Sequence, residues 1–441
     1  MTPQRVALAA DVVVAWLVDR TSPRDAMARS PLLRDLAASE RAAVGRLAAT
    51  AIAGMRRFEF VLAGANGLAA MPPARRAAAL VLAAAVAADE LLADGAERWF
   101  AAVGGPLGFA RLLRADALID DVADPTLRFA RRHSMPDWFA SRALAAFGRE
   151  ADAVVAALAQ PAPRTVRANL LRVADLDALA AELAAEGIAT RRARFAPTAL
   201  HVDGDADLFA TAAYRRGAFE QQDEASQLVA LLTAPPPRGK VLDACAGAGG
   251  KTLAIAAALA NRGVVAAADV HAGRLQALRV RARRAGATNL ALHQVDEATW
   301  PPATVAFAAG ADRILVDAPC SGTGSWRRRP EARWLVDEAS LRQLARAQQS
   351  LLARAAAALR PGARLVYATC SLLPEENEAR VADLLAADAG LEVVRLAEVL
   401  GSAVAGPIAD AQGAVLSVRP DRHGCDGFFA VALRRRRPPT D

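Results

Sequence analysis

Apolar residues recur at helical spacing through the first part of the chain. Residues 6–18, 40–62 and 74–92 carry them at intervals of three or four positions, which predicts helices with one buried face. Breaks such as Ser22-Pro23 separate these segments, as expected where one helix ends and another begins. The pattern therefore predicts an all-helical domain over residues 1–140.

The hydrophobic pattern changes at a proline-containing boundary, Gln160-Pro161-Ala162-Pro163. One more helix, over residues 142–158, precedes this boundary. We predict that residues 141–235 hold this linker helix followed by a small α/β segment. The elements expected in the small segment are a strand at 165–171, a helix at 176–186 and a strand at 199–202.

Short buried strands alternate with helices through residues 236–435, which predicts parallel βαβ units. Ligands on such doubly wound sheets bind at the carboxyl ends of the strands. The predicted fold class is α/β: a Rossmann-like domain preceded by the small α/β segment and the all-helical N-terminal domain. The strands expected in the Rossmann-like domain are 241–244, 264–269, 289–294, 312–317, 364–369 and 428–433.

The composition narrows the class of protein. The 441 residues suit two or three domains, and 54% apolar residues are ample for their cores. The net charge of +7 favours a polyanionic partner such as nucleic acid, although a solvated basic surface explains it equally well. No apolar stretch reaches the roughly 20 residues of a membrane span, and no signal peptide is recognisable. We expect a cytoplasmic protein that uses no membrane and, lacking a coiled-coil pattern, a monomer.

A glycine-rich loop follows the first strand of the Rossmann-like domain and reads Asp243-Ala244-Cys245-Ala246-Gly247-Ala248-Gly249-Gly250-Lys251-Thr252. Such a loop lets the backbone approach a ligand, and the next helix offers unpaired N–H groups to an anion such as a methionine carboxylate. The loop alone also fits dinucleotide enzymes. Asp269 ends the second strand and can accept ribose hydroxyls, and Asp296 ends the next and can hold an adenine amino group. Either aspartate could instead cap a helix.

Two cysteines follow two other strands of the same sheet, in Asp317-Ala318-Pro319-Cys320 and Thr369-Cys370-Ser371. Carbon 5 of cytosine is a poor nucleophile until a thiolate adds to carbon 6, so strand-end thiols beside a cofactor loop suggest that methyl transfer. A helix predicted to begin at Pro374 would lower the pKa of Cys370. One isolated cysteine would more often be a small core residue. The four cysteines lack zinc-type spacing, so we expect no metal.

Five separated motifs now give the chain a family resemblance over residues 160–434. Together they resemble the RsmB/RsmF family of RNA cytosine-5 methyltransferases. This family's loop more often has Ala-Pro where this chain has Gly247-Ala248. The motifs are the glycine loop, Asp317–Gly324, Tyr367–Ser371, Pro374-Glu375-Glu376-Asn377 and Gln222-Asp223-Glu224-Ala225-Ser226-Gln227.

The resemblance implies S-adenosyl-L-methionine as cofactor, bound by Cys245–Lys251, Asp269, Asp296 and Asp317. It implies that Cys370 is the nucleophile, and that Cys320 assists removal of the carbon 5 proton and release of product. Asp317 would bond the N3/N4 edge of the base. The N-terminal helices resemble a NusB-like RNA-binding domain, with 36–51 and 55–62 as counterparts, although a generic helical bundle fits as well.

Small-subunit (16S) ribosomal RNA is the expected substrate. Transfer RNA, another RNA, or a role as an RNA-binding assembly factor without needed catalysis remain alternatives. DNA cytosine-5 methylation would use Cys320 as nucleophile, and amino-group methylation is disfavoured by the Asp317–Cys320 motif. We expect Arg327-Arg328-Arg329 to bond phosphates and Trp326 to stack on a splayed base. Residues 434–437 are expected to be a solvated tail.

Overall fold

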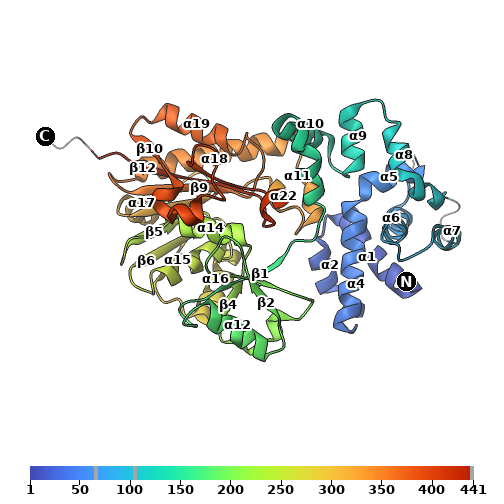
Figure 1. Ribbon diagram of the computed structural model, residues 1–441, viewed down its shortest axis with the longest axis horizontal. Helices are drawn as coiled ribbons and strands as arrows, with labels where there is room; N and C mark the ends of the chain where they lie inside the picture. The colour runs from blue at the N-terminus through green and yellow to red at the C-terminus, as the bar shows by residue number, and fades with distance from the viewer. Residues whose placement is uncertain (64–67, 103–106, 438–441) are drawn as a thin grey trace. The chain divides into compact units, whose positions relative to one another are not determined.

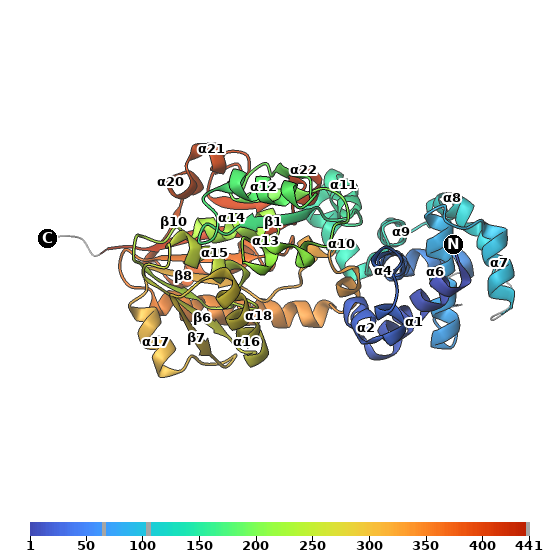
Figure 2. The ribbon, with the colours of Figure 1, turned by 90° about the horizontal axis from the view of Figure 1, so that it is seen from below.

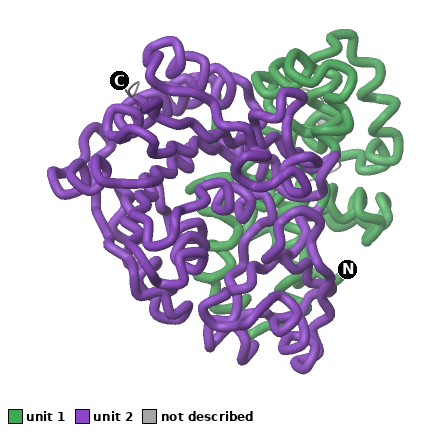
Figure 3. The backbone as a smooth tube through the Cα atoms, turned by 60° about the vertical axis from the view of Figure 1, so that its left-hand side comes forward, with its two compact units in different colours: residues 1–160, 326–337 green, residues 161–325, 338–441 purple. Residues whose placement is uncertain are grey.

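The computed structural model describes residues 1–63, 68–102 and 107–437 (Figure 1). The chain divides into two compact units (Figure 3). Unit 1 comprises Met1–Gln160 and Trp326–Asp337, and unit 2 comprises Pro161–Ser325 and Glu338–Asp441. The first boundary thus lies inside the proline-containing segment where the hydrophobic pattern changes. Our finer division into three domains stays a prediction.

Unit 1 is helical throughout its described residues, as the apolar spacing predicts. The expected helix over 40–62 is two helices, because the chain turns at Gly54, where a Cβ atom would lie 2.3 Å from the Phe58 ring. Trp16 and Leu80 are fully buried in the shared core. The α-helices are α1 (Pro3–Asp19), α2 (Pro23–Arg29), α3 (Pro31–Arg34), α4 (Ala38–Ala53), α5 (Met55–Ala63), α6 (Pro73–Ala87), α7 (Ala93–Ala101), α8 (Ala115–Asp120), α9 (Pro125–Arg132), α10 (Asp137–Phe147) and α11 (Ala151–Ala157).

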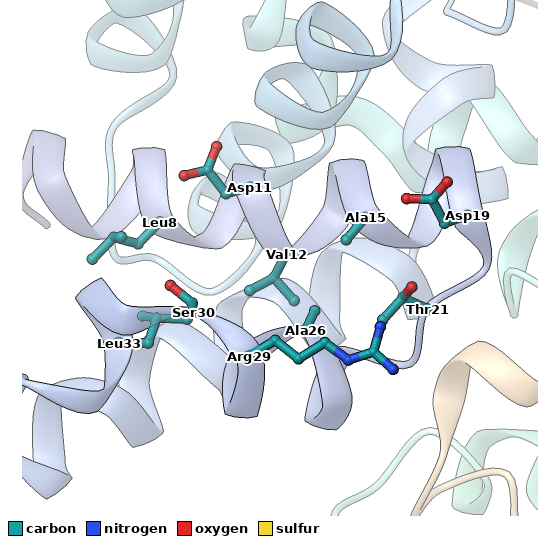
Figure 4. A pocket seen from close by; sticks show the side chains of 10 residues that line it. All are labelled: Leu8, Asp11, Val12, Ala15, Asp19, Thr21, Ala26, Arg29, Ser30 and Leu33. Atoms are coloured by element: carbon teal, nitrogen blue, oxygen red, sulfur yellow. The ribbon is translucent and has the colours of Figure 1, made fainter.

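A shallow pocket of about 310 Å³ lies between α1 and the α2–α3 pair (Figure 4). Its floor is apolar, with Val12 and Leu33 among the lining residues. The carboxylates of Asp11 and Asp19 and the guanidinium of Arg29 stand at its rim, where all three residues are exposed. No cysteine lines this pocket, so it is separate from the thiol chemistry suggested by the sequence.

The segment 326–337 belongs to unit 1, although its neighbours in sequence belong to unit 2. Trp326 is 1% exposed, and its ring centroid lies 4.6 Å from that of Phe139. The indole of Trp334 donates a 2.8 Å hydrogen bond to the carbonyl oxygen of Ile52. The expectation that Trp326 stacks on a base is therefore wrong, because tertiary packing buries its ring.

Unit 2 opens with a four-stranded antiparallel sheet in the order β2-β3-β1-β4. The three elements predicted for the small segment are present as β1, α12 and β3, although β1 ends three residues earlier than expected. One face of the sheet packs on α12 around Leu179 and Phe219, which are fully buried. The elements are β1 (Arg164–Ala168), α12 (Leu176–Ala185), β2 (Thr190–Arg192), β3 (Ala199–Val202), α13 (Ala212–Arg215), β4 (Phe219–Gln221) and α14 (Glu224–Leu232).

An eight-stranded sheet forms the rest of unit 2, in the order β10-β12-β9-β8-β5-β6-β7 with β11 paired to β12 (Figure 2). Its strands are β5 (Lys240–Asp243), β6 (Val264–Asp269), β7 (Leu290–Gln294), β8 (Arg313–Asp317), β9 (Arg364–Thr369), β10 (Leu391–Val394), β11 (Val415–Val418) and β12 (Phe428–Arg435). Strands β5 to β9 are parallel, and β12 runs antiparallel to β9. The predicted Rossmann-like α/β class is confirmed.

Helices cover both faces of this sheet. Fully buried Leu228 and Val229 lie on one face, and fully buried Leu352 and Ala355 on the other. No helix in the described ranges is long and apolar enough to cross a membrane. The helices are α15 (Gly250–Ala258), α16 (Ala272–Ala285), α17 (Pro302–Ala309), α18 (Glu338–Ala358), α19 (Glu378–Ala387), α20 (Leu396–Leu400), α21 (Ser402–Ala405) and α22 (Pro420–His423).

The expected solvated tail over 434–437 is wrong in its first half, because Arg434 and Arg435 belong to β12. The Arg434 side chain bonds Glu392 at 2.7 Å and Glu398 at 2.9 Å. Arg435 pairs with Asp388 at 2.7 Å. These arginines therefore tie β12 to β10 and to the residues around it rather than form a free tail.

Candidate active site

The two cysteines of the strand-end motifs meet at one edge of the large sheet. Strands β8 and β9 are parallel neighbours, so the segments that follow them leave the sheet side by side. The Sγ atoms of Cys320 and Cys370 are 3.4 Å apart, within hydrogen-bond reach for thiols. Both residues are free cysteines and partly exposed. The predicted juxtaposition of two thiols is therefore present.

The two thiols differ in their acidity. The pKa of Cys370 is lowered, first by the hydrogen bond from Cys320 and then by the charge of Lys251 and a bond from Ser325. The pKa of Cys320 is raised by its bond to Cys370, by burial, and by the nearby charge of Glu376. These opposite directions favour Cys370 over Cys320 as the thiol that loses its proton. A thiolate is the nucleophilic form of cysteine.

The helix that we expected to lower the pKa of Cys370 begins later than predicted. Helix α19 begins at Glu378 rather than at Pro374, and turns occupy the residues between. The first cause of the lowered pKa is the hydrogen bond from the neighbouring thiol, and the charge of Lys251 adds to it against the opposing charge of Asp317.

A buried polar network holds the two cysteine-bearing loops together. Glu376 is fully buried, and its Oε1 accepts bonds from the Ser321 N–H at 2.8 Å and from Gln348 at 3.0 Å. Its Oε2 accepts the Ser321 hydroxyl. The hydroxyls of Ser321 and Ser371 are 3.3 Å apart, so residues beside each cysteine are linked directly. Sequence reasoning quoted Glu376 as a motif member but gave it no role.

A second link between the loops is made of backbone alone. The Gly324 N–H donates to the Cys370 carbonyl at 2.9 Å, and the Gly427 N–H donates to the Gly324 carbonyl at 2.8 Å. A Cβ atom on Gly324 would lie 2.3 Å from the Gly427 carbonyl oxygen. Only glycine allows the two chains to approach this closely.

Asp317 lies at the end of β8, where it forms an ion pair with Lys251. The Lys251 Nζ atom is 2.6 Å from Asp317 Oδ2 and 5.0 Å from the centre of the Phe428 ring. The lysine is 8% exposed, whereas the Asp317 side chain is 28% exposed. The carboxylate is therefore oriented from one side and open on the other.

The glycine loop leaves β5 and leads into α15. Gly247 and Gly249 have φ angles of 55° and 87°, values that favour glycine. No side chain caps the first turn of α15, so its N–H groups are open to an anion. Below the loop, burial raises the pKa of Asp243 to about 6, although its Oδ2 accepts the Thr252 hydroxyl at 2.7 Å.

The other predicted cofactor residues lie around this loop in different surroundings. Asp269 is 6% exposed, and its two oxygens accept the Gly247 and His271 N–H groups, each at 2.8 Å. Each oxygen keeps a lone pair for another donor. Asp296 follows β7 and is exposed. Burial raises the pKa of the Cys245 thiol, which suits a backbone role rather than a chemical one. The described parts of the chain contain no group of residues that could hold a metal ion.

Comparison with known proteins gives matches over most of the chain. A family model described as 16S rRNA methyltransferase RsmB/F matches residues 230–434. A model of the RsmF/B-like ferredoxin-like domain matches residues 135–208. The probable ribosomal RNA small subunit methyltransferase B of Bacillus subtilis is 32% identical over 326 residues, which cover 72% of this chain and 70% of that protein. Its counterpart in Synechocystis is 30% identical, covering 70% and 68%.

Two solved structures share the fold. The protein PH0851 has a TM-score of 0.78 and 22% identity, with 99% of this chain and 100% of that chain covered. A methyltransferase homolog from Pyrococcus horikoshii has a TM-score of 0.60 and 25% identity, with 71% and 100% covered. Both likenesses bear on the architecture of the chain.

Proposed function

The chain belongs to the RsmB/F family of S-adenosylmethionine-dependent rRNA methyltransferases, and we propose that it methylates carbon 5 of a cytosine in 16S ribosomal RNA. The observation that carries the proposal is the pair of thiols 3.4 Å apart. One has a lowered and the other a raised pKa. Methylation at an amino group or a ribose hydroxyl needs no thiol, whereas methylation at carbon 5 needs a nucleophile at carbon 6.

The proposed reaction begins with the Cys370 thiolate. It adds to carbon 6 of the cytosine, a C–S bond forms, and the ring electrons move so that carbon 5 becomes nucleophilic. Carbon 5 would then take the methyl group that S-adenosylmethionine supplies, with S-adenosylhomocysteine as the leaving group. A base next accepts the carbon 5 proton, the C–S bond breaks, and Cys370 leaves as a thiolate. The Cys320 thiol, held beside Cys370, would assist removal of that proton and release of the product.

Asp317 would hold the base during these steps. Its carboxylate lies at the end of β8, between the thiols and the glycine loop, and Lys251 fixes one of its oxygens. The other oxygen can accept the cytosine amino group, and a protonated carboxyl can donate to N3. A donor at N3 would draw electrons from the ring and make carbon 6 more open to attack, whereas the bond from the amino group would orient the base. Lys251 would therefore have two effects: it would orient the base through Asp317, and its charge would stabilise the Cys370 thiolate.

The residues around the loop fit S-adenosylmethionine, which supplies the methyl group. The open N–H groups of α15 suit its carboxylate. Asp269 would accept its ribose hydroxyls, and Asp296 lies after the next strand, where an adenine would sit. The backbone of Cys245–Lys251 would line the rest of the cofactor site. The two positive-φ glycines keep that backbone bare for close approach.

The net charge of +7 supports RNA as the substrate. We propose that residues 1–140 act as a NusB-like RNA-binding domain and that the protein works as a monomer. Arg327, Arg328 and Arg329 remain candidates for phosphate contacts, and the last two are exposed. A target cytosine must be unpaired or flipped out of a helix before a thiol can reach it.

Covalent trapping on RNA that carries 5-fluorocytosine tests the chemistry. Fluorine at carbon 5 cannot leave as a proton, so the adduct persists and runs as a slower band on a denaturing gel. We expect wild type to form the band and Cys370→Ala to lose it. With ordinary cytosine, Cys320→Ala should accumulate the adduct because release is slow. Cys425→Ala is the matched control, since Cys425 is a buried free cysteine outside the two strand-end motifs in sequence.

The trapping experiment also separates the main alternative chemistry. If Cys320 were the nucleophile, as in DNA cytosine-5 methylation, Cys320→Ala would lose the band and Cys370→Ala would keep it. That result would overturn the proposed assignment of the two thiols. Methyl transfer that survives Cys370→Ala would overturn the covalent mechanism altogether.

A map of 5-methylcytosine in cellular RNA, with and without the gene, tests the substrate. Loss of one position in 16S rRNA would support the proposal and identify the target. Loss of a position in transfer RNA would redirect the substrate and keep the chemistry. An unchanged map, with normal trapping in vitro, would favour an assembly role in which catalysis is dispensable.

A further inference from the structure

Helix α16 packs directly against the glycine loop. A Cβ atom on Gly249 would lie 2.1 Å from the Leu278 side chain, so this side chain rests on the bare backbone of the loop. Arg281 follows Leu278 by three positions and lies on the same face of α16. Its Nη1 donates a 2.6 Å hydrogen bond to the Ala248 carbonyl oxygen.

The Arg281 guanidinium is itself held in place by Glu220 of β4. Nε and Nη2 donate to Glu220 Oε2 at 3.1 and 2.8 Å, which leaves Nη1 directed at the loop. Glu220 is 2% exposed, and its other oxygen accepts a bond from Arg284. A guanidinium group with two nitrogens bonded to a buried carboxylate has little rotational freedom.

The bond from Arg281 fixes one peptide plane of the loop. The carbonyl of Ala248 points to Arg281, and the N–H of Gly249 in the same peptide donates to the Ala246 carbonyl at 2.9 Å. Both ends of this plane are therefore held, and a flip would break both bonds. The plane immediately precedes Gly249, the N-cap of α15, so it sets where the open N–H groups of that helix begin.

We propose that Arg281 is a positioning residue for the cofactor loop, which holds the Ala248 carbonyl from α16 while Glu220 holds its guanidinium. The chain has alanine at position 248 where the family more often has proline, so no ring stiffens this turn. Arg281 supplies the missing restraint from outside the loop. The inference rests on the proposed function only in treating the loop as the S-adenosylmethionine site.

Calorimetric binding of S-adenosylhomocysteine to the full chain tests this role. We expect Arg281→Met, which keeps the length of the side chain, to raise Kd by about tenfold, a factor that corresponds to 1.4 kcal/mol. The KM for S-adenosylmethionine should rise in parallel while kcat at saturation stays within about twofold, as expected for lost uniform binding. Glu220→Gln should weaken binding in the same direction by releasing the guanidinium.

Two further variants separate positioning from simple stabilisation. Arg281→Lys keeps one donor and should recover part of the lost affinity. Arg279→Met removes an exposed arginine of the same helix and should bind like wild type. Unchanged Kd in Arg281→Met, with or without a lower Tm, would overturn the inference. The Kd comparison does not depend on cytosine chemistry, so failure to methylate cytosine would refute the proposed function alone.

Discussion

The buried carboxylate of Glu376 gives the sharpest test of how the thiol site is held. Replacement by alanine would remove three hydrogen bonds and leave the Ser321 N–H and one Gln348 N–H buried without an acceptor, while the Ser321 hydroxyl would keep only its 3.3 Å contact with Ser371. Each such donor costs about 1–3 kcal/mol. We expect Glu376→Ala to destabilise unit 2 by about 5 kcal/mol, which approaches the full stability of many domains.

Glu376→Gln should cost much less, because an amide of the same shape can restore the network. Its oxygen can accept from Ser321 N–H and Gln348, as Oε1 does now, while its NH₂ group donates to the Ser321 hydroxyl. The loss is then mainly that of charge assistance, about 1–2 kcal/mol in total. The predicted gap between the alanine and glutamine variants is therefore about 3 kcal/mol.

Hydrogen exchange measured by mass spectrometry would locate the effect. Peptides that cover 319–325 and 370–373 should lose protection in Glu376→Ala and keep most of it in Glu376→Gln. Urea midpoints supply the corresponding free energies. Glu297→Gln, at an exposed position of the same unit, is the control. Equal destabilisation by alanine and glutamine, or unchanged exchange in both loops, would refute the reasoning.

Three other changes test separate contacts. Lys251→Met should move the rising limb of the pH–rate profile to higher pH, because the lysine lowers the pKa of Cys370 and its loss leaves less thiolate at any given pH; an unmoved limb would contradict this. Gly324→Ala should lower Tm and methyl transfer together, since its Cβ would meet the Gly427 carbonyl at 2.3 Å; a variant with wild-type Tm would show that the backbone yields easily. Trp326→Ala should cost about 3–5 kcal/mol in calorimetric unfolding, as for a buried core residue, and a loss below about 1 kcal/mol would speak for an exposed ring.

The strands that carry the site could be predicted closely from the sequence. Segments 264–269 and 364–369 are strands with those bounds, because a parallel sheet covered on both faces makes a continuous apolar run. Strands β10 and β11 are only four residues long, and we did not predict them. Glycine-rich turns and buried strands leave a local pattern in the sequence, so they can be predicted without knowing which residues they contact in the fold.

Contacts between distant parts of the sequence account for what could not be predicted. Trp326 lies beside three arginines in sequence, which is typical of a nucleic-acid contact, but its neighbour in space is Phe139. Glu376 meets Ser321, 55 positions earlier, and Arg281 meets a loop carbonyl 33 positions earlier. No periodicity in the sequence encodes such pairs. These long-range contacts determine which polar residues are bonded within the protein and which remain accessible to a ligand.

The different roles that we propose for the two thiols rest on the same kind of contact. Cys320 and Cys370 are chemically identical side chains at equivalent strand ends, so position alone does not assign the nucleophile. The cation of Lys251 lies on the side of Cys370, and the anion of Glu376 acts on Cys320. Lys251 belongs to α15, and Glu376 to the turn between Cys370 and α19. Exchange of the proposed roles would require reversal of the thiol–thiol hydrogen bond as well as a change in these charges, because that bond is the first cause of both pKa shifts.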